Sequence, residues 1–144
     1  MSIAAYKSTI RQSESPRQIE RRILSRLTGQ LEAHAAFDTA TGLERIEILS
    51  RGLRAALAEN QTFWNELKYD LAQPGNALSP ELRAGLISIA LWIDRQTSAV
   101  MGGDPGVMAL AEINRTIIAG LAGTPAHPTP VAAEAPIPAL HPGG

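Results

Sequence analysis

Few side chains in this chain could perform chemistry, and their spacing suits neither metal binding nor catalysis. Of the three histidines, His34 stands alone, while His127 and His141 lie near the C-terminal end. No His-x-x-x-His pair and no carboxylate cluster has the spacing of metal ligands, so we expect no metal site. Glu44 and Glu47 would share a helix face, but catalytic carboxylates need a pocket that shifts their pKa values. We therefore interpret these two glutamates as exposed helix charges.

Other kinds of active site are also missing from the sequence. Its one glycine-rich loop, residues 102–106 (Gly-Gly-Asp-Pro-Gly), lacks the Gly-Lys-Ser/Thr ending of a phosphate-binding loop and is interpreted as a turn. There is no Gly-x-Ser-x-Gly motif of a serine hydrolase. The absence of cysteine excludes disulfides, thiolate catalysis and cysteine-ligated zinc. We predict no catalytic residue, no cofactor and no metal, and hence a protein that is not an enzyme.

The composition is that of a single globular domain. The 144 residues are 44% hydrophobic and 19% charged, which is enough apolar material for one core. The net charge of −1 gives no general attraction to nucleic acid or to an anionic membrane. The longest apolar stretch, Leu86–Ile93, is far shorter than the about 20 residues that a membrane span needs, and the N-terminus does not resemble a signal peptide. We expect a cytoplasmic protein that does not bind membranes.

Four segments with helical periodicity would position these side chains. The predicted helices cover residues 16–36, 42–72, 80–101 and 105–121, with short connections between them. Three of them begin at the pairs Ser15-Pro16, Ser79-Pro80 and Asp104-Pro105, in which the first residue caps the helix and proline fits the first helical position. The other begins near Thr41, where Glu44 completes a capping box. The pattern predicts an all-α fold, a small bundle of four helices.

The second and third predicted helices have the least regular apolar patterns. An apolar stripe runs along residues 42–72 through Leu43, Ile46, Leu53, Leu57, Trp64, Leu67 and Leu71. Because the stripe keeps its phase, we favour one long helix over two helices with a break at residues 60–62. In residues 80–101, Ile87 and Leu91 lie opposite the main stripe, which is typical of a helix at the centre of a bundle.

The C-terminal end differs in composition from the rest of the chain. Residues 123–144 contain six prolines together with alanine, glycine and two histidines. Such a segment has too little apolar surface to pack against a core. We predict one helical domain over residues 1–122 and a disordered Pro/Ala-rich tail over residues 123–144.

Three features admit both a structural and a functional interpretation. Trp64 and Trp92 are typical core residues, although tryptophan also anchors interfaces. Asn60 and Asn114 interrupt apolar stripes, either as buried amides that fix helix register or as contacts for a partner. Six of the thirteen basic residues lie in the first 26 positions and give the first predicted helix a basic face. We favour a solvated surface there, because a nucleic-acid site usually interleaves aromatic residues.

Several strings of the sequence are similar to those of the flagellar biosynthesis regulator FlaF family. They are Tyr6 and residues 15–20, 63–64, 74–78, 82–84, 87–98 (Ile-Ser-Ile-Ala-Leu-Trp-Ile-Asp-Arg-Gln-Thr-Ser) and 113–117 (Ile-Asn-Arg-Thr-Ile). The resemblance covers roughly residues 2–121, and the last two strings are the most specific. Gln96 stands where histidine is usual in the family, and the tail has no counterpart in it.

The resemblance implies a cytoplasmic factor needed for flagellin production and filament assembly. It implies action on flagellin itself, alongside the regulator FlbT, which acts on flagellin message and is a second candidate partner. We therefore expect a flagellin-binding chaperone or adaptor. The alternative is an RNA-binding post-transcriptional regulator of flagellin expression that uses the basic face of residues 16–36. The sequence does not determine the oligomeric state.

Six residues are expected to contact the partner: Asn60, Trp64, Asp94, Arg95, Asn114 and Arg115. Arg95 lies away from the apolar stripe of its predicted helix, and Arg115 lies at the rim of its own. Core packing requires arginine at neither position, although both belong to the strings that carry the resemblance. Each arginine is expected to be an interface charge or to form a local ion pair, which for Arg95 would involve a glutamate on a neighbouring helix.

Overall fold

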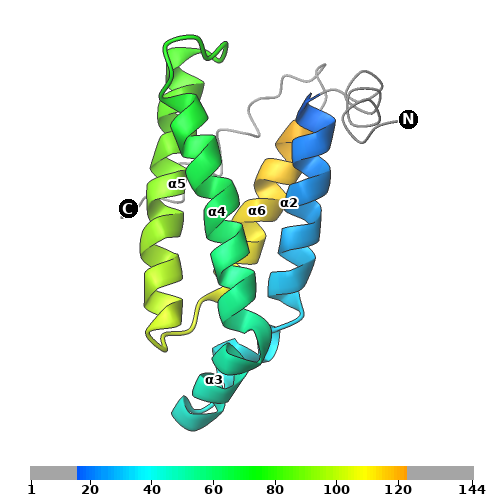
Figure 1. Cartoon of the computed structure of the whole chain (residues 1–144), viewed down its shortest axis with the longest axis vertical. Coiled ribbons are helices and arrows are strands. Elements are labelled where there is room, and N and C mark those ends of the chain that lie inside the picture. Colours follow the sequence, from blue (N-terminus) through cyan, green and yellow to red (C-terminus); the bar gives the residue numbers. More distant parts are fainter. Residues whose placement is uncertain (1–15, 123–144) are drawn as a thin grey trace, which may run out of the picture.

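The computed structural model describes residues 16–122, and it confirms the predicted all-α fold, since these residues contain no β-strand. The predicted tail, residues 123–144, lies outside the described residues, as do the basic side chains Lys7 and Arg11. With the labels of Figure 1, the elements are α2 (Pro16–Glu32), the 3-10 helix η1 (Ala35–Thr39), α3 (Gly42–Ile48), the π-helical turn η2 (Leu49–Leu53), α4 (Arg54–Leu71), α5 (Pro80–Met101) and α6 (Val107–Ala122).

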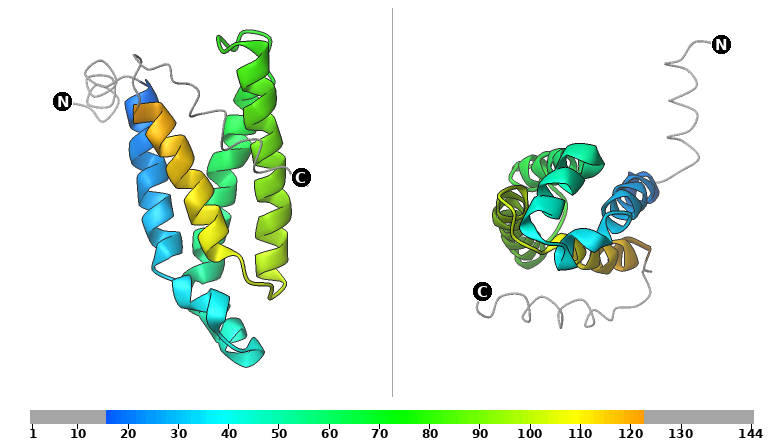
Figure 2. Two further views of the ribbon diagram at one scale, coloured as in Figure 1. Left: turned by 180° about the vertical axis from the view of Figure 1, so that it is seen from behind. Right: turned by 90° about the horizontal axis from the view of Figure 1, so that it is seen from below.

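The four long helices form a bundle in which successive helices run in opposite directions (Figure 1). α2 packs along α6, α4 packs along α5, and α2 also contacts α4. α5 and α6 contact each other much less, and Figure 2 shows them diverging from the loop that connects them. The side between α5 and α6 is therefore the least closed side of the bundle.

Local capping signals set the start of two helices as the sequence predicts. Thr41 caps α3 in a capping box, because its hydroxyl accepts from the N–H of Glu44 while the Glu44 carboxylate accepts from the N–H of Thr41. Ser79 accepts from the N–H of Leu82, and Pro80 occupies the first turn of α5. α5 spans Pro80–Met101, which is the range predicted for the third helix.

The second predicted helix is not continuous, because the chain changes direction at Arg51 and Gly52. Gly52 has φ 127°, in the left-handed region that glycine adopts without steric cost, and Arg51 has φ −103° and ψ 31°. A Cβ at position 52 would lie 3.1 Å from Nε2 of His34. The favoured single helix over residues 42–72 is therefore wrong. The alternative break at residues 60–62 is wrong as well, since α4 continues through them.

The change of direction alters which apolar side chains reach the core. Leu43 and Ile46 of α3 are 82% and 63% exposed, whereas Leu49 and Leu53 are buried. Leu43 and Ile46 therefore do not join the core with the other apolar residues of this stripe. A glycine within the stripe was the one local sign that regular helix could end there.

α5 lies at an edge of the bundle rather than at its centre. It packs along α4, touches α6 over a short stretch, and leaves Leu91 44% exposed. On its second apolar face Ile87 is only partly buried and Leu91 is exposed, so the described residues do not enclose this face, which contradicts the expectation of a central third helix.

The first and last predicted helices are shorter than expected at one end. α2 ends at Glu32, and the 3-10 helix η1 follows it. α6 begins at Val107, two residues later than predicted. The N–H groups of Gly106, Val107 and Met108 donate instead to the carboxylate of Asp38 in η1, at 2.7, 2.8 and 3.0 Å. A residue nearly seventy positions earlier thus caps the last helix.

We expect Ile89→Ala to lower the free energy of unfolding by about 2–5 kcal/mol, because Ile89 is 3% exposed and joins the main core. The matched control is Leu91→Ala in the same helix, where 44% exposure should keep the loss below about 1 kcal/mol. Urea unfolding followed by circular dichroism measures both values. Equal losses for the two variants would mean that α5 is packed on both faces.

Candidate functional site

Three of the six expected partner residues lie inside the bundle and bond to one another. Asn60, Trp64 and Asn114 are all 0% exposed. Nε1 of Trp64 donates to Oδ1 of Asn114 at 3.0 Å, and Nδ2 of Asn114 donates to Oδ1 of Asn60 at 2.8 Å. This chain of hydrogen bonds links α4 to α6 and sets the register between them. None of the three side chains is open to a partner in this arrangement.

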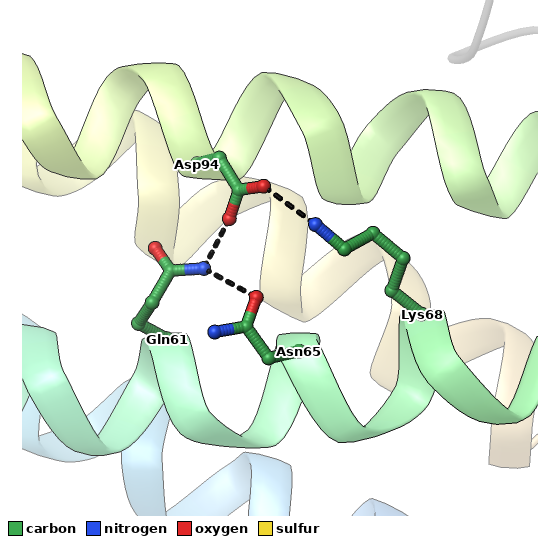
Figure 3. A network of polar contacts seen from close by, with 4 residues as sticks. All are labelled: Gln61, Asn65, Lys68 and Asp94. Atoms are coloured by element: carbon green, nitrogen blue, oxygen red, sulfur yellow. Dashed lines mark hydrogen bonds and ion pairs between the residues drawn. The ribbon is translucent and has the colours of Figure 1, made fainter.

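Asp94 joins α5 to α4 through a polar network that Figure 3 shows. Its carboxylate accepts from Nζ of Lys68 at 2.8 Å and from Nε2 of Gln61, which also donates to Oδ1 of Asn65. The side chains of Lys68 and Asp94 are only about one-third exposed, at 32% and 33%. Asp94 therefore holds α5 against α4, and its two oxygens are already occupied.

Arg115 forms a two-pronged ion pair with Glu32. Nε and Nη2 of Arg115 lie 2.6 and 2.5 Å from the two carboxylate oxygens of Glu32. These hydrogen bonds, together with the positive charge, lower the pKa of Glu32 below its ordinary value. The pair connects α6 to α2, so Arg115 corresponds to the local ion pair that the sequence allowed.

Arg95 is the one expected partner residue that is exposed without an intramolecular ion pair in the described part of the chain. It lies on the outer face of α5, and no carboxylate of residues 17–120 pairs with it. The expected pair with a glutamate of a neighbouring helix is thus not found. Leu91, one turn earlier on the same face, is 44% exposed. Charge and apolar surface therefore lie side by side there.

Trp92 lies on the flank of α5 that is turned toward α6. It precedes Gln96 by one turn, and Nε2 of Gln96 donates to the carbonyl of Gly106, next to the start of α6. Trp92 is packed against the core but is only partly buried. On α6, Ile117 is also partly buried and lies on the flank opposite Arg115, away from α2. We refer to Leu91 and Arg95 on the outer face of α5, together with Trp92 and Ile117 on the adjoining flanks of α5 and α6, as the α5–α6 face.

The basic face of α2 is exposed, but an acidic residue of α4 balances part of its positive charge. Its arginines, Arg17, Arg21, Arg22 and Arg26, all face solvent, and α2 contains no aromatic residue. Nη1 of Arg26 lies 3.7 Å from the carboxylate of Glu59 on α4. An acidic neighbour and the lack of aromatic side chains weaken this surface as a nucleic-acid site.

Residues 16–122 contain no group of three His, Asp or Glu side chains arranged to hold a metal ion. Within the same range, none of the helices has the length and apolar character needed to span a lipid bilayer. The α5–α6 face combines the exposed Leu91, the partly buried Trp92 and Ile117, and Arg95, which has no ion pair among residues 17–120.

Comparison with known proteins supports a flagellar role. The family model described as "Flagellar protein FlaF" matches residues 2–121, which is most of the chain. No curated protein and no solved structure matches it. The match includes both strings that contribute to the α5–α6 face, residues 87–98 and 113–117.

Proposed function

We propose, from the premise that the chain belongs to the FlaF family of flagellar proteins, that it is a flagellin-binding chaperone or adaptor for flagellum assembly. The family is not an enzyme family, which agrees with a binding role. The proposed site is the α5–α6 face, which keeps Arg95 of the six residues expected from sequence.

The observation that carries this proposal is the position of Leu91 and Arg95. Core packing accounts for Ile89 and Ile93 in the same string, and Asp94 bonds to α4. Core packing does not explain why Leu91 is exposed beside Arg95. Arg95 is exposed as well, and it has no ion pair among residues 17–120. Apolar anchors with a charge at their rim are typical of an interface.

The proposed partner is an elongated amphipathic segment of flagellin. Flagellin has terminal amphipathic segments that stay unpaired until the filament forms. Amphipathic helices bind through apolar residues at three- and four-residue spacing. The partly buried Trp92 and Ile117, on two diverging helices, provide apolar surface for such a segment (Figure 2). Arg95 at the edge would pair with an acidic residue of that segment.

We expect Arg95→Glu to weaken flagellin binding roughly tenfold while leaving the fold intact, because the residue is exposed and unpaired. Isothermal titration of the purified full chain with purified flagellin measures this effect. Arg115 should be left unchanged in the test, since Arg115→Glu would place a carboxylate beside Glu32 and push α6 away from α2.

The matched control is Arg21→Glu, which makes the same charge change on the basic face of α2. Flagellin binding should survive this variant if the α5–α6 face is the site. The RNA-binding alternative predicts the opposite pattern. In that case RNA would co-purify unless nuclease is added, binding would weaken steeply with salt, and Arg21→Glu would be the damaging variant. Normal flagellin binding by Arg95→Glu would contradict the proposed site.

A further inference from the structure

α3 displays two large apolar side chains at one end of the molecule. Leu43 is 82% exposed and Ile46 is 63% exposed, and none of the residues of α3 is buried. Their spacing of three residues puts them on the same side of the helix. Figure 1 places α3 at the end of the bundle opposite the first residues of α2 and the last residues of α6.

This exposure does not come from a loosely attached helix. Arg45, on the inner side of α3, donates to the carbonyls of Phe37, Asp38 and Gly103 at 2.9, 3.0 and 3.0 Å. Its guanidinium also lies over the ring of Phe37, 5.4 Å from the centroid. The capping box fixes the first turn, and the buried Leu49 follows the last turn. α3 is thus held in place while its apolar side faces water.

A fixed helix can bind at a lower entropic cost than a mobile one, because its side chains are already positioned. Exposed leucine and isoleucine give no benefit to folding, whereas one helical face with two apolar anchors matches helix-in-groove recognition. We propose that α3 is a docking helix that inserts Leu43 and Ile46 into an apolar groove on a second protein, one whose groove has a basic rim.

The charges beside the anchors indicate the chemistry of that partner. Glu44 and Glu47 are exposed next to Leu43 and Ile46. Arg51 pairs with Glu47 at 2.9 Å, but both side chains are mostly exposed, so the pair is weak. Glu44 has no basic partner in the described residues, so lysine or arginine at the groove rim would complement it.

A second copy of the chain fits this surface less well than a different protein does. Two copies packed through α3 would bring Glu44 and Glu47 of each copy near those of the other. A different protein whose groove has a basic rim would instead meet these carboxylates with opposite charge.

The inference is independent of the flagellin proposal, because α3 and the α5–α6 face are built from different elements. If both are correct, the protein connects flagellin to another protein. Its test uses the full chain in flagellated cells, with a photo-reactive diazirine amino acid in place of Leu43. We expect a covalent adduct with a protein that is neither flagellin nor this chain.

The adducted protein is then purified, and its affinity for the unmodified chain is compared with its affinity for variants. We expect Leu43→Ser with Ile46→Ser to weaken binding at least about tenfold while the thermal midpoint stays unchanged. Tyr69→Ser, the matched loss of an exposed large side chain on α4, should leave this affinity unchanged, because Tyr69 is 71% exposed and belongs to neither proposed surface. Glu44→Gln with Glu47→Gln should weaken binding a few-fold and reduce its salt dependence.

Several results would overturn the proposal. An adduct with this chain would show a homodimer contact, and an adduct with flagellin would assign α3 to the flagellin site. The absence of any adduct would show that α3 stays exposed in the cell. Unchanged affinity after Leu43→Ser with Ile46→Ser would show that the captured protein binds elsewhere.

Discussion

Trp64→Ala is expected to lower the free energy of unfolding by about 3–5 kcal/mol, which is a large part of the about 5–15 kcal/mol typical of a domain. Trp64 is fully buried and is the largest side chain in the core, so alanine leaves a large cavity. The substitution also removes the donor to Oδ1 of Asn114, which then has no partner among the described residues. Chemical unfolding followed by circular dichroism measures the loss.

Trp64→Phe separates the two contributions, because it keeps most of the ring volume and removes the indole N–H. We expect it to cost about 1–3 kcal/mol, the range for leaving a buried acceptor unsatisfied. The fluorescence of Trp92 remains as a second reporter of unfolding in both variants. A loss below about 1 kcal/mol for Trp64→Ala would contradict the interior position of Trp64.

Asp38→Ala is expected to lower the free energy of unfolding by about 2 kcal/mol, at the upper end of the range for helix caps. The carboxylate accepts three backbone N–H groups at the start of α6, and hydrogen bonds to a charged group are stronger than neutral ones. The matched control is Asp104→Ala, which removes the cap that the sequence predicts. Asp104 is exposed, so we expect a loss below about 0.5 kcal/mol. A larger loss of stability for Asp104→Ala than for Asp38→Ala would show that Asp104 caps α6, as the sequence predicts.

The same site predicts how stability depends on pH. Burial alone would raise the pKa of Asp38, but the N–H groups of Gly106, Met108 and Val107, with the nearby Arg45, outweigh it and lower the pKa below 3.8. A carboxyl group whose pKa is lower in the folded than in the unfolded state binds its proton more weakly when folded. Its stabilisation is therefore complete above the unfolded pKa and is lost as pH falls through the folded pKa.

Unfolding experiments between pH 6 and pH 2 should show this dependence as a difference between variants. Asp38→Asn keeps an oxygen acceptor but cannot titrate, so its stability should approach that of the unsubstituted protein at the lowest pH. A stability difference that stays constant over the whole range would show that the charge of Asp38 contributes nothing to the cap.

The sequence predicted the helices well wherever their ends depend on neighbouring residues. The Ser79-Pro80 cap and the Gly102-Gly103 pair define the predicted range of α5, and Thr41 with Glu44 defines the start of α3. These signals act over three or four residues, so they are visible without a fold. The periodicity of apolar residues likewise predicted four helices, and the distinctive strings predicted the family.

The sequence predicted the site less well, because exposure depends on packing between distant segments. Asn60 and Asn114 could equally be buried or open until α4 and α6 are placed side by side. Arg95 and Arg115 both lie outside the core-facing side of their helices, yet among the described residues only Arg115 has a carboxylate opposite it, that of Glu32, 83 residues away in sequence. Helical periodicity predicts which side of a helix is apolar, but it does not indicate what that side faces.

The sequence by itself determined the all-α class, the range of α5, the absence of cysteine chemistry and the FlaF family, since each follows from local pattern or composition. Only the tertiary structure decided that the chain turns at Gly52, that Asp38 caps α6, and that α5 lies at an edge. Each of these depends on residues brought together by folding, such as His34 against Gly52. The two exposed surfaces, at α3 and at the α5–α6 face, exist for the same reason. At each of them the bundle leaves apolar side chains exposed, namely Leu43 and Ile46 at α3 and Leu91 at the α5–α6 face.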